Sequence, residues 1–223
     1  LGSQAIASSL KAGAIGLAIV MVFMIVMYAV PGIAASLALA IYTTLVIATL
    51  YLFDITLTLP GIAGIILGIG MAVDANVIVF ARIREEIATG KSVQTSMKIG
   101  FQKAMSAILD GNITTLIASV VLMALGSGTV KGFAYTLMIG IILSLFTAMV
   151  VTRYILYSLY ALGLKSEKLY GRAKERKSID FIGKKAVFFT ISGIIIAAGL
   201  ISMGVHSATE GKALNYGLDF MGG

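Results

Sequence analysis

The sequence contains no cysteine and no tryptophan, and its 223 residues include only two prolines and one histidine. Without cysteine there is neither a disulfide scaffold nor a thiolate metal site, and one histidine leaves too few ligands for a zinc or copper centre. Charged residues are also scarce, at 12% against about 25% in an average soluble domain. Because 59% of the residues are hydrophobic, the composition excludes a disordered linker protein and indicates an integral membrane protein.

Six apolar stretches are long enough to cross a membrane as helices, which takes about 20 residues. Four contain no charged side chain, and two contain a single one each, Asp74 and Asp110. Alternation of apolar and polar residues is absent, which argues against a barrel. The sequence therefore predicts an all-α integral membrane protein with a six-helix transmembrane bundle. The predicted spans are 12–30, 33–53, 61–81, 104–125, 132–152 and 186–205.

Lysine and arginine are concentrated in two connecting segments. Residues 82–103 hold five and residues 153–185 hold nine of the 17 in the chain. Because positively charged loops stay on the cytoplasmic side, both segments are predicted to be cytoplasmic, with the 54–60 and 126–131 loops and both termini outside. The formal net charge of +7 is thus a topology signal. No nucleic-acid partner is expected, since no aromatic residues interleave with the basic ones as stacking platforms.

The segments between spans also predict where the chain divides. Residues 1–162 are expected to form a bundle of five spans, and residues 163–185 a basic cytoplasmic linker. Residues 186–223 are expected to form a sixth span and the start of an outer domain. Because the chain does not begin with methionine and ends without a finished element, we expect it to be a piece of a longer polypeptide.

Two local patterns predict how neighbouring spans are joined. Pro31 and Gly32 predict a tight turn between the first two spans. Around residues 91–104, apolar residues recur at helical spacing among three lysines, which predicts an amphipathic helix lying on the anionic leaflet. A solvated connector is the alternative for this segment. The recurring apolar residues are Val93, Met97, Phe101 and Ala104.

Asp74 is the most informative single residue, because thirteen uncharged residues precede it within its span. An ionised carboxylate at the centre of a membrane helix costs about 2.5–3.5 kcal/mol on insertion scales. Desolvation favours the neutral form of such a group, so a carboxyl that gains and loses a proton there suits a proton relay. The alternative is a structural aspartate fixed by hydrogen bonds to neighbouring helices.

Small and polar residues surround Asp74 on the same span. Gly64 and Gly68 are four residues apart, a spacing that lets another helix approach closely, and Gly70 extends the glycine-lined surface. Such contacts usually serve packing, although they also allow helices to slide. Asn76 is two residues from Asp74 and therefore points elsewhere, where we expect it to bind water or a neighbouring helix.

Asp110 introduces a second polar segment, on the fourth span. Asn112, Thr114 and Thr115 follow it within about one turn. One interpretation is that Asp110 caps the helix or interacts with its dipole. The other is that these residues form a polar seam that faces Asp74 and holds water.

Motifs for bond-making chemistry are missing from the sequence. There is no P-loop, no GxSxG and no HExxH, so neither a nucleotide nor a metal cofactor is expected. We therefore expect the chain not to be an enzyme. An intramembrane carboxyl without a nucleotide site indicates coupling to an ion gradient, which supplies about 2.3 kcal/mol per charge per 100 mV.

Several segments closely resemble motifs of the SecD/SecF family of protein-export membrane proteins. SecD-like segments are residues 70–77 (GMAVDANV), 80–86 (FARIREE), 110–115 (DGNITT) and 126–134 (GSGTVKGFA). SecF-like segments are residues 179–185 (IDFIGKK) and 217–223 (GLDFMGG). The order of the two sets resembles that of a fused chain, in which a SecD bundle runs into the start of SecF.

This resemblance implies half of a transmembrane domain of the resistance–nodulation–division superfamily, in the bacterial cytoplasmic membrane. It implies a proton-driven accessory of protein export, with Asp74 matching the family's membrane aspartate and its acidic and basic partners lying in the SecF half. The implied partners are the SecYEG translocon, the remaining SecD and SecF segments, unfolded exported polypeptide and membrane lipid. A small-molecule or lipid exporter of the same superfamily, or a non-catalytic translocon scaffold, are the alternatives.

Overall fold

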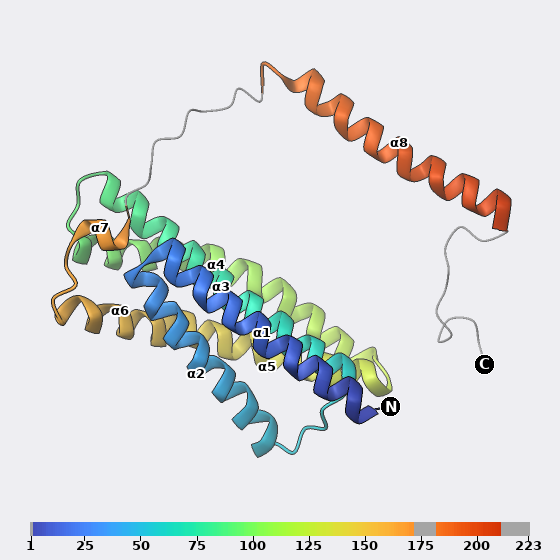
Figure 1. The fold of residues 1–223 in the computed structure, drawn as a ribbon, viewed down its shortest axis with the longest axis horizontal. Helices are drawn as coiled ribbons and strands as arrows, with labels where there is room; N and C mark the ends of the chain where they lie inside the picture. Colours follow the sequence, from blue (N-terminus) through green and yellow to red (C-terminus); the bar gives the residue numbers. More distant parts are fainter. Residues whose placement is uncertain (1, 172–181, 211–223) are drawn as a thin grey trace. The chain divides into compact units, whose positions relative to one another are not determined.

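The computed structural model describes residues 2–171 and 182–210, and every regular element in these residues is helical. The chain divides into two compact units, Leu1–Lys174 and Glu175–Gly223 (Figure 1). Six helices in the described part are long and apolar enough to cross a membrane, which confirms the predicted fold class.

The first unit is a bundle of five long helices. Its first four are α1 (Gly2–Tyr28), α2 (Val30–Leu52), α3 (Leu59–Ala88) and α4 (Val93–Leu125). A fifth helix runs without a break through α5 (Gly128–Phe146), the π-helical turn η1 (Thr147–Val151) and α6 (Thr152–Ala161), as Figure 1 shows. A short helix, α7 (Glu167–Tyr170), follows.

The second unit contains the sixth apolar helix, α8 (Lys185–Glu210). Of the SecF-like segments, residues 179–181 and 217–223 lie outside the described residues, as do residues 172–178 of the predicted linker and the predicted start of an outer domain beyond residue 210.

The turn between α1 and α2 lies two residues earlier than predicted. Ala29, with φ of 50°, makes the turn, and Pro31 and Gly32 are already in the first turn of α2. Proline is favoured there because its fixed φ suits a helix start and its missing N–H needs no partner. Position 32 requires glycine because α1 passes close to it: a Cβ there would lie under 3.0 Å from the backbone of Met24.

The prediction of an amphipathic helix on the leaflet around residues 91–104 is wrong. This segment is the beginning of α4, which starts after the N-cap Ser92 and continues unbroken to Leu125. The apolar residues predicted to face lipid are at most 3% exposed and pack against other helices of the bundle. Helical spacing identified the buried face correctly, but it does not distinguish a lipid surface from a protein core. The residues concerned are Val93, Met97, Phe101 and Ala104.

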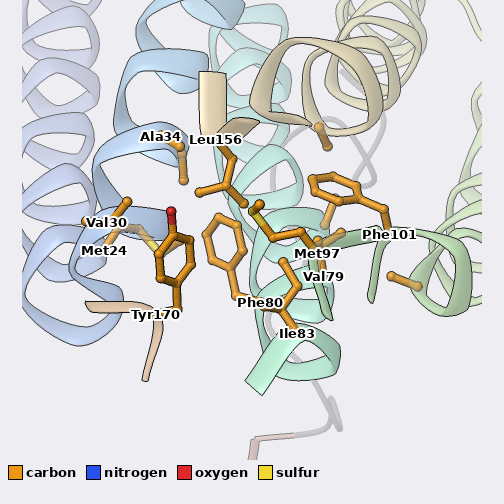
Figure 2. Packing of buried hydrophobic residues seen from close by; sticks show 14 of the residues in the cluster. Met24, Val30, Ala34, Val79, Phe80, Ile83, Met97, Phe101, Leu156 and Tyr170 are labelled. Carbon is orange, nitrogen blue, oxygen red and sulfur yellow. The ribbon is translucent and has the colours of Figure 1, made fainter. Parts of the chain in front are cut away.

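The main core cluster lies around the α3–α4 turn, at the end of the bundle that we call the inner end because its loops are predicted to be cytoplasmic. Side chains from α1, α2, α3, α4, α6 and α7 meet there (Figure 2). Phe80 and Tyr170 are among its largest fully buried members, and Leu156 and Met97 pack near them. The larger of the two hydrophobic core clusters therefore lies at the inner end.

Candidate functional site

Local sequence sets both ends of α3, the helix that carries Asp74. The Thr58 hydroxyl accepts a hydrogen bond from the Gly61 N–H at 3.1 Å and caps the start, and Pro60 occupies the first turn. At the other end, Gly90 adopts φ of 85° and turns the chain toward α4. With 30 residues the helix is about 45 Å long, so its last turns from Arg82 onward extend beyond a hydrocarbon layer of about 30 Å.

Asp74 lies on the surface of α3 next to α4. Its side chain is exposed and borders a pocket of about 190 Å³ between the two helices. Within the described part of the chain its carboxylate has no hydrogen bond or ion pair. The pocket is lined by Met71, Asp74, Ala75, Ile78, Ala107, Ile108, Gly111, Asn112 and Thr115.

Two polar residues of α4 share this pocket with Asp74. Asn112 donates through Nδ2 to the Ile108 carbonyl at 2.7 Å, and the Thr115 hydroxyl donates to the Gly111 carbonyl at 3.2 Å. Because the Thr115 proton is used on its own helix, its oxygen is left as an acceptor. The pocket therefore brings the Asp74 carboxylate together with an amide and a hydroxyl of α4.

Asp110 and Thr114 do not belong to the pocket. Asp110 is in the middle of α4, so it does not cap the helix, and its carboxylate accepts a hydrogen bond from the Ser106 hydroxyl at 3.4 Å. Thr114 is exposed and donates to the Gly111 carbonyl at 2.9 Å. Residues 108, 111, 112 and 115 share one face of a helix, and positions 110 and 114 fall on another.

The glycines of α3 differ in what they contact. A Cβ on Gly64 would lie under 3.0 Å from the Thr136 hydroxyl of α5, and one on Gly68 would lie equally close to the Tyr42 hydroxyl of α2. Gly68 also packs against Gly140 of α5. Gly70 is exposed, and a Cβ there would have nothing within 4 Å.

Asn76 faces away from Asp74 into the bundle and is only 3% exposed. Its Nδ2 donates to the Ala72 carbonyl at 3.0 Å, and its Oδ1 accepts from no group within the described residues. In the same ranges, no three acidic or histidine side chains are grouped as metal ligands.

The inner end contains a charged cluster that the sequence reasoning missed. Glu86 of α3 is 4% exposed and accepts hydrogen bonds from Lys103 at 2.6 Å and from Lys91. These bonds, with that of Lys103 the larger effect, hold the pKa of the Glu86 carboxyl below its usual range. The sequence carried a signal for this cluster, since a glutamate stands before the turn between two helices and lysines follow it.

Arg84, on the same turn of α3, connects three segments. Its guanidinium donates to the Met27 carbonyl of α1 at 2.6 Å and to the Tyr170 carbonyl of α7 at 3.3 Å. It also lies 4.4 Å from the centroid of the Tyr28 ring. The inner end of α3 is therefore tied to the ends of α1 and α7.

The family comparison matches the part of the chain that contains these features. Residues 1–161 match the family described as "Protein export membrane protein SecD/SecF, C-terminal". The chain belongs to this family. Together with its six apolar helices, membership makes it a multi-pass protein of the bacterial cytoplasmic membrane.

Individual relatives agree with this assignment. The chain is 52% identical to the protein translocase subunit SecD of Acidaminococcus fermentans over 159 residues, 71% of this chain and 38% of that relative. It is 37% identical to the protein translocase subunit SecDF of Bacillus subtilis, covering 100% of this chain and 32% of that relative. The chain thus spans about a third of the length of these relatives, and its match to the fused protein includes α8.

A solved structure resembles the whole chain. The crystal structure of SecDF, described as a translocon-associated membrane protein, from Thermus thermophilus matches with a TM-score of 0.82 and 32% identity. The match covers 100% of this chain and 30% of that one. The resemblance stated from the sequence motifs is therefore confirmed.

Proposed function

We propose that this chain supplies the SecD-side half of a membrane domain that uses the proton-motive force to assist protein export through the Sec translocon. The observation that carries the proposal is Asp74, a carboxyl in mid-span that is exposed on the bundle and unpartnered within the described residues. The names of its relatives support the export role, since they are called protein translocase subunits.

The placement of Asp74 supports a relay rather than a structural aspartate. A structural aspartate in a membrane span is held by donors from neighbouring helices, because an unpaired charge in lipid is costly. Asp74 instead borders a small pocket with polar groups of α4 and has an open side. A further protein segment on that side, from the SecF half, would complete the proton path. Protonation would then remove a charge at this contact and change which helix packing is favoured.

In this proposal the partners are the SecYEG translocon, the remaining SecD and SecF segments, and unfolded polypeptide on the outer side. The chain itself hydrolyses nothing and needs no cofactor, and the proton gradient is the energy source. The change in helix packing would be transmitted to outer domains through the 54–60 and 126–131 connections. These two connections join the outer ends of the helices around the pocket.

The test compares Asp74→Asn with Asp110→Asn in the protein expressed at the full length that its gene encodes. Both carboxylates lie at a similar level of the α3–α4 pair, and only Asp74 lines the pocket. We expect Asp74→Asn to reduce gradient-dependent export into inverted vesicles by about a hundredfold, typical of losing a proton-transfer group. Asp110→Asn should stay within about twofold of the parent protein.

Proton flux distinguishes this function from the alternatives. A relay predicts proton uptake in vesicles that depends on Asp74 and accompanies polypeptide export. A scaffold predicts export that is unaffected by Asp74→Asn, and this result would contradict the proposal. Flux stimulated by a small apolar substrate in place of a polypeptide would identify an exporter instead.

A further inference from the structure

A second pocket, of about 420 Å³, lies at the inner end of the fifth long helix, away from Asp74. It is at the point where the uncharged stretch 132–152 ends, and Arg153 is the first charged residue after it. In the predicted topology this position is the cytoplasmic boundary of the membrane. The lining residues are Met149, Val150, Arg153, Tyr154 and Tyr157.

The Arg153 guanidinium is held in place by aromatic rings. It lies 5.8 Å from the centroid of Phe101 on α4 and 5.9 Å from that of Tyr157. Phe101 is 2% exposed, so the arginine covers a buried ring. Among the described residues Arg153 has no carboxylate partner and its side chain donates no hydrogen bond. Its donors are therefore available to a ligand.

An exposed apolar stripe runs along the same helix toward this pocket. Ile142 and Phe146 are 51% and 48% exposed and are four residues apart in a regular helix, so they share a face. Val150, in the π-helical turn that follows, is 38% exposed. Tyr154, 70% exposed, continues the series on the far side of the boundary. A ligand that has a charged end and a long apolar part would match the pocket and the stripe together.

We propose that this pocket binds the headgroup of an anionic phospholipid of the cytoplasmic leaflet. The guanidinium fork of Arg153 binds the phosphate, since its geometry matches phosphate oxygens. The Tyr154 and Tyr157 rings lie at headgroup level, as aromatic residues do at membrane interfaces. One acyl chain lies along the stripe from Val150 to Ile142. This site does not depend on the role of Asp74, and it gives the inner end a direct contact with the anionic leaflet.

The experiment measures lipid binding to the purified full-length protein by native mass spectrometry. Phosphatidylglycerol and phosphatidylcholine with the same acyl chains are titrated, so that only the headgroup differs. Both lipids carry the phosphate that Arg153 binds, but only phosphatidylcholine adds a choline cation, which the guanidinium repels. We therefore expect one phosphatidylglycerol to bind about tenfold more tightly than phosphatidylcholine. Inorganic phosphate at millimolar concentration should not displace it, because the acyl chain contributes to binding.

Two variants assign the preference to the pocket. Arg153→Gln should abolish it, and Lys98→Gln is the matched control, because Lys98 is an exposed cation on α4 of the same predicted side and outside the pocket. Equal losses in both variants would overturn the proposal in favour of diffuse electrostatics. No preference in the parent protein would also overturn it, and would indicate that protein covers this face. If Arg153→Gln does not fold, Arg153→Lys is measured instead. A drop of about threefold in the affinity for phosphatidylglycerol, from loss of the guanidinium fork, supports the site, and an unchanged affinity overturns it.

Discussion

Charged side chains have polar partners at the inner end of the α3–α4 pair, and Asp74 in its middle has none within the described residues. At the inner end, the buried Glu86 carboxylate has two lysine partners, and Arg84 is bonded to backbone carbonyls of two other helices. In the middle, the Asp74 carboxylate is exposed and has no partner within the described residues. The same helix carries all three residues.

Packing differs between the two regions as well. The inner end is filled by large apolar and aromatic side chains (Figure 2), whereas in its outer half α3 packs on α5 through Gly64 and Gly68. Interlocked large side chains resist displacement, because interiors at close-packed density tolerate little change. Glycine contacts present a smoother surface. The comparison indicates that α3 is held at its inner end by large side chains and ion pairs, and on the other side of Asp74 by close glycine contacts.

The largest stability effect is expected at the ion-pair cluster of Glu86, Lys91 and Lys103 at the inner end, which we call the anchor. Glu86→Ala leaves Lys91 and Lys103 without their shared partner and leaves a space at the inner end where the carboxylate was. We expect the melting temperature to fall by several degrees, against about one degree for Glu85→Ala, which removes only the exposed pair with Arg82. Equal shifts in thermal melts of the two variants would remove the distinction between anchor and surface.

The same anchor predicts a pH dependence. The folded state lowers the pKa of Glu86, so its contribution to stability is complete above the unfolded value of about 4.3 and is lost as pH falls through the lower folded value. Glu86→Gln cannot titrate and should lack this part of the acid profile. The melting temperatures of the parent protein and of Glu86→Gln, measured from pH 7 to pH 3, should therefore converge at the acid end. A constant difference between them over this range would contradict a pH-dependent contribution from Glu86.

A more local effect is expected from the glycines of α3 that precede Asp74. Gly68→Ala should destabilise by about 1–3 kcal/mol, because its methyl group would overlap the buried Tyr42 hydroxyl. Gly70→Ala is the matched control, two residues away in the same helix and with no atom within 4 Å of its Cβ. Alanine there should be neutral or stabilise by about 0.5–1 kcal/mol through helix propensity. Unfolding in mild detergent measures both, and effects of the same sign would contradict close packing at Gly68.

Much of the fold was predictable, because a membrane span is decided by length and hydrophobicity alone. The features that were missed depend on which face of a helix meets protein. The spacing of Val93, Met97 and Phe101 identified a buried face, but only the contacts show that it faces other helices. Asn112 and Asp110 are two residues apart, and the packing of α3 on α4 determines that only Asn112 reaches the pocket. The role of Asp74 stays a prediction, since its expected partners are outside this chain.

The π-helical turn Thr147–Val151 has a consequence for the arginine pocket. A π-turn holds one residue more than an α-turn, so every later side chain is rotated by about 100° from its position in a regular helix. The Thr152 hydroxyl donates to the Thr147 carbonyl at 3.1 Å and satisfies a group inside the turn. Deleting one residue from this turn would swing Leu156 out of the core and move Arg153 off the Phe101 ring. One inserted residue thus determines the direction in which the inner third of the helix points.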